Sequence, residues 1–301
     1  MNICVYGAGA IGSLFASYLS KHHKVSCIAR TPHVKAVNNY GLMVTGKTEF
    51  QGKIPFYESI FDLSDTPYLV LLTVKAFDTK KAAEDIFQII TKDTLILSIQ
   101  NGLGNIEKLT SVIPSSQVLA GITSHGSLFL QSGIIKHTGI GKTRIGELDG
   151  VLSKRLRSLQ ELFIRSGITV DISTNIKKEI WKKAIVNASI NPLTTIFQCK
   201  NGYLLENPIL TNLLEKICIE STLISTACGF DLNYQDMIEY TYEVINDTKL
   251  NSSSMLQSIL QKKKTELNEI NGMILDEGKK RNCDVSLNEM ITHIIPMMYR
   301  L

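Results

Sequence analysis

The start of the chain alternates between two hydrophobic periods, one typical of strands and one typical of helices. Residues 2–6 form a short, β-rich apolar run, and apolar side chains then recur at helical spacing from Ile11 to Leu19. The sequence GAGAIG, at residues 7–12, lies at the junction. The pattern therefore predicts a strand, a glycine turn and a helix, in that order.

Further apolar runs predict an α/β domain built around a sheet with buried parallel strands. The predicted strands are residues 24–29, 68–74, 94–99 and 168–171, and a helix is predicted at 151–165. Residues 40–56 alternate between apolar and polar and contain three glycines, so we expect short strands with turns on the edge of this sheet. Residues 117–147 are also broken by glycines and predict the strands that complete the sheet.

Polar residues in the segment 179–194 recur at a regular spacing. Lys183, Asn187 and Asn191 follow one another every four residues among apolar neighbours, which places them on one stripe of a helix. Because Asn is a poor former of helix interiors, such a stripe indicates a site for a polar ligand. The alternative is a solvated Lys183 and two locally bonded amides, with Asn191 before Pro192 ending the helix.

The chain beyond residue 171 contains no further strand-like runs, and we expect it to be helical. Residues 251–257 are rich in helix N-cap residues and precede an amphipathic pattern that predicts one long helix reaching about Arg281. Lys262, Lys263 and Lys264 are expected on its solvated face, and Glu266 in its middle. The patterns thus predict an N-terminal α/β domain, residues 1–170, followed by an all-α domain, residues 171–301.

Composition narrows the classes of ligand and partner. The net charge is only +4 and the basic residues are interspersed with acidic ones, which favours a small anionic ligand over a nucleic acid. No apolar run approaches the roughly 18 residues of a membrane span, and the chain begins without a basic leader. The six cysteines show no metal-ligand spacing and are interpreted as reduced thiols, so we expect a cytoplasmic protein without a metal site.

The glycine turn carries the first prediction of chemistry. In this motif the first glycine permits a tight turn, the second lets backbone N–H groups approach a pyrophosphate, and the third allows the helix to pack closely on the strand. The expected cofactor-binding residues here are Gly7, Ala8, Gly9, Ala10, Ile11 and Gly12. Their position after the first strand and before a helix favours a dinucleotide over a purely structural turn.

Three polar residues follow predicted strands, where α/β sheets bind their ligands. Arg30 stands where an NAD-specific protein usually has an acidic residue, and its guanidinium suits a 2′-phosphate, so NADPH is favoured over NADH. Lys75 and Asn101 follow the two buried strands and are placed to meet the cofactor or the substrate. The alternatives are a solvated Arg30, a solvated Lys75 and an Asn101 that only forms a turn. His125 and His137 are predicted to be structural because neither has a carboxylate partner at a recognisable spacing.

Over nearly its whole length the chain resembles the 2-dehydropantoate reductase (ketopantoate reductase) family. The shared motifs are GAGAIG at 7–12, Arg30, TVKAFD around Lys75, QNGLGN around Asn101, EIWKKAIVNASINPLT from 179, SSMLQ from 253 and KKTELNEINGMI ending at Ile274. The resemblance implies reduction of the 2-oxo group of ketopantoate to (R)-pantoate with NADPH, on the route to pantothenate and coenzyme A. It also implies a Rossmann domain joined to a helical domain, with the active site in the cleft between them.

The resemblance also assigns roles to individual residues. It implies that Lys183 is the catalytic acid, that Asn101, Asn187, Asn191 and Ser254 contact the substrate, and that Glu266 belongs to the site. An ammonium group near the ketone would stabilise the developing oxyanion and supply its proton. Ser258 and Asn268 depart from the family pattern, where Asp is common at both positions.

Two alternatives remain open from the sequence. Because Ser258 and Asn268 depart from the family pattern, an NADPH-dependent reductase of another branched 2-oxo acid is one alternative. A non-catalytic NADPH sensor is the other, but it would be expected to lack the pair Lys183 and Glu266. The sequence leaves open whether the chain forms a homodimer.

Overall fold

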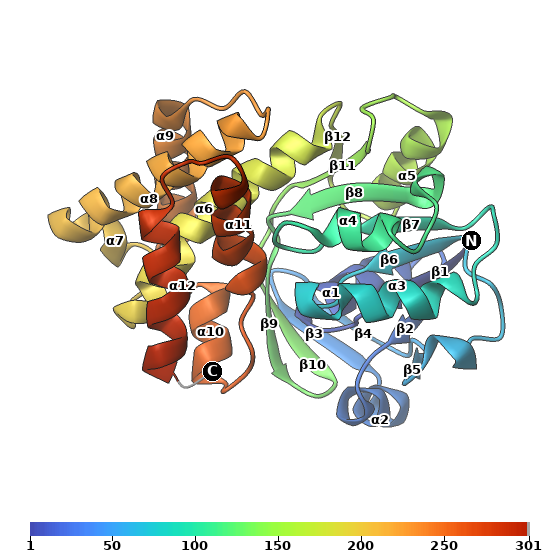
Figure 1. Cartoon of the computed structure of the whole chain (residues 1–301). Coiled ribbons are helices and arrows are strands. Elements are labelled where there is room, and N and C mark those ends of the chain that lie inside the picture. The colour runs from blue at the N-terminus through green and yellow to red at the C-terminus, as the bar shows by residue number, and fades with distance from the viewer. Residues whose placement is uncertain (300–301) are drawn as a thin grey trace. The chain divides into compact units, whose positions relative to one another are not determined.

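The computed structural model describes residues 1–299 and divides into two compact units (Figure 1). The first unit contains Met1–Gln100 and Asn105–Glu179, and the second contains Asn101–Gly104 and Ile180–Leu301. The first is an α/β unit built on a mostly parallel sheet and the second is helical, which confirms the predicted fold class. The division falls inside helix α6, Ile176–Ile196.

The first unit is built on an eight-stranded sheet with the order β12-β11-β8-β7-β6-β1-β2-β5. Its strands are β1 (Asn2–Tyr6), β2 (Lys24–Ile28), β5 (Phe56–Tyr57), β6 (Leu69–Leu72), β7 (Leu95–Ser98), β8 (Val118–Thr123), β11 (Thr143–Glu147) and β12 (Val170–Ile172). All neighbouring pairs are parallel except β8 with β11. The predicted strands at 2–6, 24–29, 68–74, 94–99 and 168–171 are therefore confirmed.

The central strands are apolar on both sides because helices cover both faces of this sheet. On one face Ile3, Val5 and Leu71 share a core with α1 (Ala10–Leu19) and α5 (Lys154–Arg165). On the other, Cys4 and Val70 pack with α3 (Thr79–Phe87) and α4 (Asn105–Thr110). Successive residues of β1 and β6 therefore belong to different cores, because side chains of an extended chain point alternately to the two faces of the sheet. The positions of these helices can be followed in Figure 1.

A second, four-stranded sheet corrects the prediction for residues 40–56 and 117–147. Its order is β4-β3-β10-β9, with β3 (Leu42–Gly46), β4 (Phe50–Gly52), β9 (Gly126–Gln131) and β10 (Ile134–Gly139). These strands do not continue the main sheet, which takes only β5, β8 and β11 from the two segments. The chain leaves the main sheet through α2, Thr31–Tyr40, and the buried side chains of Leu42, Val44 and Ile135 join the core around α1. Alternation predicts a strand with one buried face, but it does not say which sheet the strand joins.

The second unit consists of helices around cores of its own. They are α6 (Ile176–Ile196), α7 (Tyr203–Glu206), α8 (Pro208–Ala227), α9 (Tyr234–Asp247), α10 (Ser254–Leu260), the π-helix η4 (Asn268–Gly272), α11 (Met273–Lys280) and α12 (Ser286–Tyr299). The largest core joins Ile185, Leu214, Ile245 and Ile291 from four of these helices. Within residues 1–299, no helix is both long enough and apolar enough to cross a membrane.

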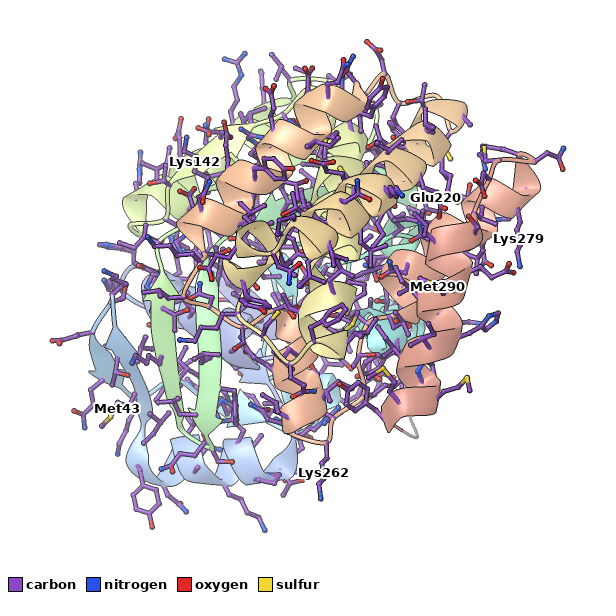
Figure 2. All side chains as sticks on the ribbon, turned by 90° about the vertical axis from the view of Figure 1, so that its left-hand side faces the viewer. Met43, Lys142, Glu220, Lys262, Lys279 and Met290 are labelled. Carbon is purple, nitrogen blue, oxygen red and sulfur yellow. The ribbon has the colours of Figure 1, made fainter. Side chains whose placement is uncertain are left out.

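The long helix predicted from residue 251 to Arg281 is wrong, because the chain breaks after α10. Ser253 caps α10 by accepting a hydrogen bond from the Leu256 N–H at 3.2 Å. At the other end Lys262 has φ 53°, and the Lys263 N–H donates to the Ser258 carbonyl at 2.8 Å. Such a left-handed residue with a bond back across the last turn terminates a helix. Lys262 therefore lies in a turn and points outward beyond α10 (Figure 2) rather than along a helix face.

Candidate functional site

The loop after β1 has the shape that its glycines permit. Gly7 has φ 102°, and a Cβ atom there would lie 2.5 Å from the Val74 backbone nitrogen. A Cβ atom at Gly12 would lie 2.5 Å from Thr73 Oγ1 and 2.6 Å from the Gly7 carbonyl oxygen. Both positions therefore exclude any side chain, because the loop, α1 and the segment after β6 pack against one another.

The same loop leaves backbone donors available at the start of α1. Gly9 is the N-cap residue, so no side chain caps this helix, and a Cβ atom built there meets nothing closer than 3.9 Å. The N–H groups of Ala10, Ile11 and Gly12 are first-turn donors without an acceptor inside the helix. The N–H of Ala8, by contrast, already donates a hydrogen bond to the Ile28 carbonyl, at 2.9 Å. Open donors beside an uncrowded glycine at a helix N-terminus suit a phosphate group.

Arg30 and Lys75 lie at the carboxyl ends of β2 and β6, the strands on either side of β1. Arg30 is the N-cap of α2, and its side chain is 83% exposed. Its Nη2 lies 3.8 Å from Asp78 Oδ2, at the end of the short helix η2 (Ala76–Asp78). Lys75 is partly buried just before η2. The structure thus places the predicted residues of the first unit along one edge of the sheet.

The predicted polar stripe of the second unit lies on α6. Lys183 and Asn187 are partly buried, and Asn191 is 4% exposed. The helix continues past Pro192 to Ile196, so Asn191 does not end it. Proline has no N–H for the Ala188 carbonyl four residues earlier, and the Asn271 side-chain amide donates to that carbonyl instead, at 3.1 Å.

Lys183 is the cation of this stripe, and its surroundings change its acidity. Loss of solvent around the ammonium lowers the pKa of Lys183 from 10.5 to about 8, while the negative charge of Glu266 acts in the opposite direction. Glu266 itself is 6% exposed. The structure therefore brings together the two ionisable residues predicted for the site, although 83 positions separate them in the sequence. A lysine with such a pKa can release its proton near neutral pH.

Asn191 carries a buried donor with nothing to bind it. Within residues 1–299 its Nδ2 has no hydrogen-bond partner, and the same holds for the hydroxyl of Thr195, one helical turn further along. Both side chains are buried. Since buried polar groups are nearly always hydrogen-bonded, two such atoms on one stripe indicate that a polar ligand or water completes the site.

Ser254 and Asn101 both belong to the second unit, but they come from segments far apart in the sequence. Ser254 is the exposed first residue of α10, and the preceding Ser253 accepts a hydrogen bond from the Thr194 hydroxyl of α6 at 2.7 Å. Asn101 begins the turn 101–104, where the Leu103 N–H donates to the Glu269 carbonyl at 2.8 Å. This turn is therefore fixed to the segment that carries Glu266. The start of α10 is thus bonded to α6, and the turn 101–104 is bonded to η4.

A buried hydrogen-bond network behind the stripe was not predicted from the sequence. Asn271 donates to Asn288 Oδ1 at 3.0 Å, and Asn288 Nδ2 donates to Glu220 Oε1 at 2.8 Å. Glu220, labelled in Figure 2, also accepts the N–H groups of Leu287 and Asn288 at the start of α12, each at 2.8 Å. Pro192 inside the helical pattern was the one available signal, since its missing N–H requires a substitute donor.

His125 and His137 form a separate polar chain in the first unit. His137 Nε2 lies 2.9 Å from the Gly139 carbonyl, which only accepts, so this nitrogen carries the proton. His137 Nδ1 then accepts from Thr48 Oγ1 at 2.8 Å, and His125 Nδ1 lies 3.1 Å from His137 Nε2. Desolvation lowers the pKa of His125 to about 4 and also lowers that of His137. Neutral, mutually bonded imidazoles suit the structural role expected of them.

Two family models together match nearly the whole chain. Residues 3–150 match the model described as ketopantoate reductase PanE/ApbA, and residues 175–298 match the one described as ketopantoate reductase PanE/ApbA C terminal. A 2-dehydropantoate 2-reductase of Pyrococcus abyssi is 33% identical over 296 residues, covering 98% of this chain and 97% of the relative. Another, from Vibrio cholerae, is 30% identical over 292 residues, with 97% and 95% covered.

Solved structures are similar over the same length. A D-mandelate dehydrogenase in a ternary structure with NADH and anilino(oxo)acetate has a TM-score of 0.94 and 25% identity, covering 100% of this chain and 99% of that one. A PanE/ApbA family ketopantoate reductase from Ralstonia eutropha has a TM-score of 0.91 and 26% identity, with the same coverage.

Proposed function

The chain belongs to the ketopantoate reductase PanE/ApbA family, and we propose that it reduces 2-dehydropantoate (ketopantoate) to (R)-pantoate with NADPH. The observation that carries the proposal is the pair Lys183 and Glu266, a lysine whose pKa is lowered to about 8 beside a buried carboxylate. The 2-dehydropantoate 2-reductases of Pyrococcus abyssi and Vibrio cholerae support the choice of substrate. The product would enter pantothenate and coenzyme A synthesis in the cytoplasm.

The first unit, proposed as the cofactor domain over residues 1–170, supplies the groups for a nicotinamide dinucleotide. The first-turn donors of α1 would hold the pyrophosphate, and Gly9 leaves room for it. Arg30 would contact the 2′-phosphate that distinguishes NADPH from NADH, and Lys75 the part of the cofactor nearer the substrate. When bound, the nicotinamide supplies the hydride. These residues fit the group by donor type, by charge and by their common edge of the sheet.

The proposed substrate domain, residues 171–301 with Asn101, supplies the acid and the polar contacts. Hydride addition to the ketone carbon leaves negative charge on its oxygen, and the Lys183 ammonium would stabilise that charge and donate the proton. Asn191, with its unpaired buried Nδ2, would bind the substrate carboxylate together with Asn101, Asn187 and Ser254. Glu266 would accept a hydrogen bond from the substrate hydroxyl.

A second candidate function is reduction of a different 2-oxo acid. The likeness to a D-mandelate dehydrogenase with NADH supports it, since mandelate is a 2-hydroxy acid with a phenyl side chain. Ser258 and Asn268, which depart from the family pattern near Glu266, are further reasons to test it. A non-catalytic NADPH sensor is disfavoured because both Lys183 and Glu266 are present.

Oxidation of NADPH, followed by absorbance, tests these proposals against a panel of 2-oxo acids. The panel contains ketopantoate, its analogue with methyl in place of hydroxymethyl, and phenylglyoxylate. Ketopantoate should give the highest kcat/KM, because a buried carboxylate left without its hydroxyl partner penalises the methyl analogue. A higher kcat/KM with phenylglyoxylate would replace the first proposal by the second. Turnover of none of the three would contradict both.

A further inference from the structure

The carboxylates of Asp78 and Glu58 lie beside Arg30, which would contact the 2′-phosphate, and beside the next residue, Thr31. Arg30 Nη2 is 3.8 Å from Asp78 Oδ2, and the hydroxyl of Thr31 donates to Glu58 Oε2 at 2.5 Å. The two donors are consecutive in the sequence, yet their acceptors come from different segments, Asp78 from beyond β6 and Glu58 from directly after β5. Neither carboxylate has a role in the proposed chemistry.

The sheet order explains why these groups meet. The neighbouring strands β6, β1, β2 and β5 are all parallel, so their carboxyl ends share one edge of the sheet. The glycine loop follows β1, Arg30 and Thr31 follow β2, and Glu58 follows β5. In a doubly wound sheet this edge receives the dinucleotide, with the adenosine ribose near the end of the second strand. Asp78 and Glu58 therefore lie where a ribose 2′-substituent would be read.

The two cofactors differ at this point by about two negative charges. NADPH carries a 2′-phosphate, which is nearly doubly ionised at neutral pH, and NADH carries a neutral hydroxyl. A carboxylate that already holds Arg30 both competes with the phosphate for the guanidinium and repels it. The same carboxylate leaves the binding of a neutral hydroxyl almost unchanged. The carboxylate of Glu58, which accepts a hydrogen bond from Thr31, would likewise repel the phosphate and not the hydroxyl.

We infer that Asp78 and Glu58 determine the cofactor selectivity of this chain by reducing the preference for NADPH that Arg30 confers. The inference rests on the proposed binding of a nicotinamide dinucleotide, but not on the identity of the 2-oxo acid. For exposed charges about 5–6 Å apart in a high dielectric, removing one carboxylate should change the affinity for a phosphate dianion about three- to tenfold.

The test measures the dissociation constants of NADPH and NADH separately, without substrate, in the wild-type chain and in variants. Asp78→Asn and Glu58→Gln should each raise the affinity ratio for NADPH over NADH about three- to tenfold, with the NADH constant within about twofold of wild type. Asp78→Glu keeps the charge and should stay near the wild-type ratio. Asp65→Asn is the matched control, because it removes the carboxylate paired with Lys24 at 2.5 Å, at the opposite end of β2.

The increase in the NADPH-to-NADH affinity ratio should also be smaller at high salt, since the pairs Arg30–Asp78 and Thr31–Glu58 are exposed. An unchanged ratio in Asp78→Asn and Glu58→Gln, a lower one, or an equal rise in Asp65→Asn would overturn the inference while leaving the proposed reductase activity intact. Conversely, a chain that binds both cofactors with the expected ratios but turns over no 2-oxo acid would support the inference and refute the proposed function. Failure of wild type to bind either cofactor would overturn both.

Discussion

Lys183 and its neighbour Lys182 are consecutive in α6, but their ammonium groups lie in different surroundings. Lys183 lies on the stripe with Asn187 and Asn191, and the negative charge of Glu266 raises its pKa against the effect of burial. The Nζ of Lys182 instead lies 4.8 Å from the Tyr240 ring centroid. Consecutive residues of a helix point about 100° apart, so the two ammonium groups face different surroundings. The four-residue spacing placed Lys183 on this stripe, but the sequence could not predict the lowered pKa, which depends on tertiary burial.

Replacing Lys183 by Ala should lower kcat about 10²–10⁴-fold, the range expected for loss of a general acid, while the dissociation constant of NADPH stays within a few fold. Lys182→Ala is the matched control and should keep kcat within about twofold of wild type. The measurements are steady-state kinetics at saturating ketopantoate and a cofactor titration. A near-normal kcat for Lys183→Ala would falsify its role as the proton donor.

The pKa of Lys183 also predicts a pH profile. The proposed reduction needs the protonated ammonium of Lys183, so kcat/KM should be highest below pH 8 and fall as pH rises through about 8, where the proton is lost. Glu266 raises this pKa, and Glu266→Gln should therefore move the alkaline limb to lower pH. Profiles measured between pH 6 and about 10 check both statements. A limb that stays in place, or moves to higher pH, would show that another group controls the profile.

At the scale of elements, sequence patterns located strands and helices well where one period persisted to a clear end. The turn between β1 and α1 was predictable because glycines mark it, and β6 and β7 because they are apolar throughout. The break after α10 was not, since Leu256, Leu260 and Leu267 keep a helical rhythm across it and Lys262 has no intrinsic preference for positive φ. The second sheet was also missed, because pairing between β3 and β10 joins residues about 90 positions apart.

The hydrogen bond from Asn271 to the Ala188 carbonyl, which takes the place of the missing Pro192 N–H, gives a prediction about stability. Asn271→Ala removes the donor to the Ala188 carbonyl and to Asn288, leaving buried acceptors unpaired, and should lower the free energy of unfolding by about 1–3 kcal/mol. Asn268→Ala, one turn earlier in η4 and exposed, is the matched control and should change it by less than about 0.5 kcal/mol. Urea unfolding followed by far-UV circular dichroism measures both. Equal effects would mean that the bond to Ala188 is not what supports α6.

For the whole molecule, the two units differ in how they should respond to acid. The buried imidazoles are concentrated in the first unit, where desolvation lowers the pKa of His33 and of His125 to about 4. His33 accepts the Gly133 N–H at 2.9 Å and hydrogen-bonds Ser13 in α1, so it ties the glycine-loop helix to the second sheet. Trp181, the one tryptophan of the chain, lies in a core of the second unit with Ile224 and Ile270. Its fluorescence therefore reports on that unit separately.

Acid should consequently destabilise the first unit before the second. A histidine whose folded pKa is about 4 and whose unfolded pKa is about 6.5 contributes its full stability above pH 6.5 and loses it as pH falls toward 4, because the unfolded chain binds the proton more tightly. Since neither ring is wholly removed from water, we expect roughly 2–4 kcal/mol from His33 and His125 together. Far-UV circular dichroism should show loss of structure at lower urea concentrations as pH is lowered from 7 to 4.5, ahead of the change in Trp181 fluorescence. His33→Gln removes one titrating group and should flatten this pH dependence, whereas His22→Gln, at an exposed site, should leave it unchanged. If both variants kept the wild-type slope, the acid sensitivity would have to come from carboxylates instead.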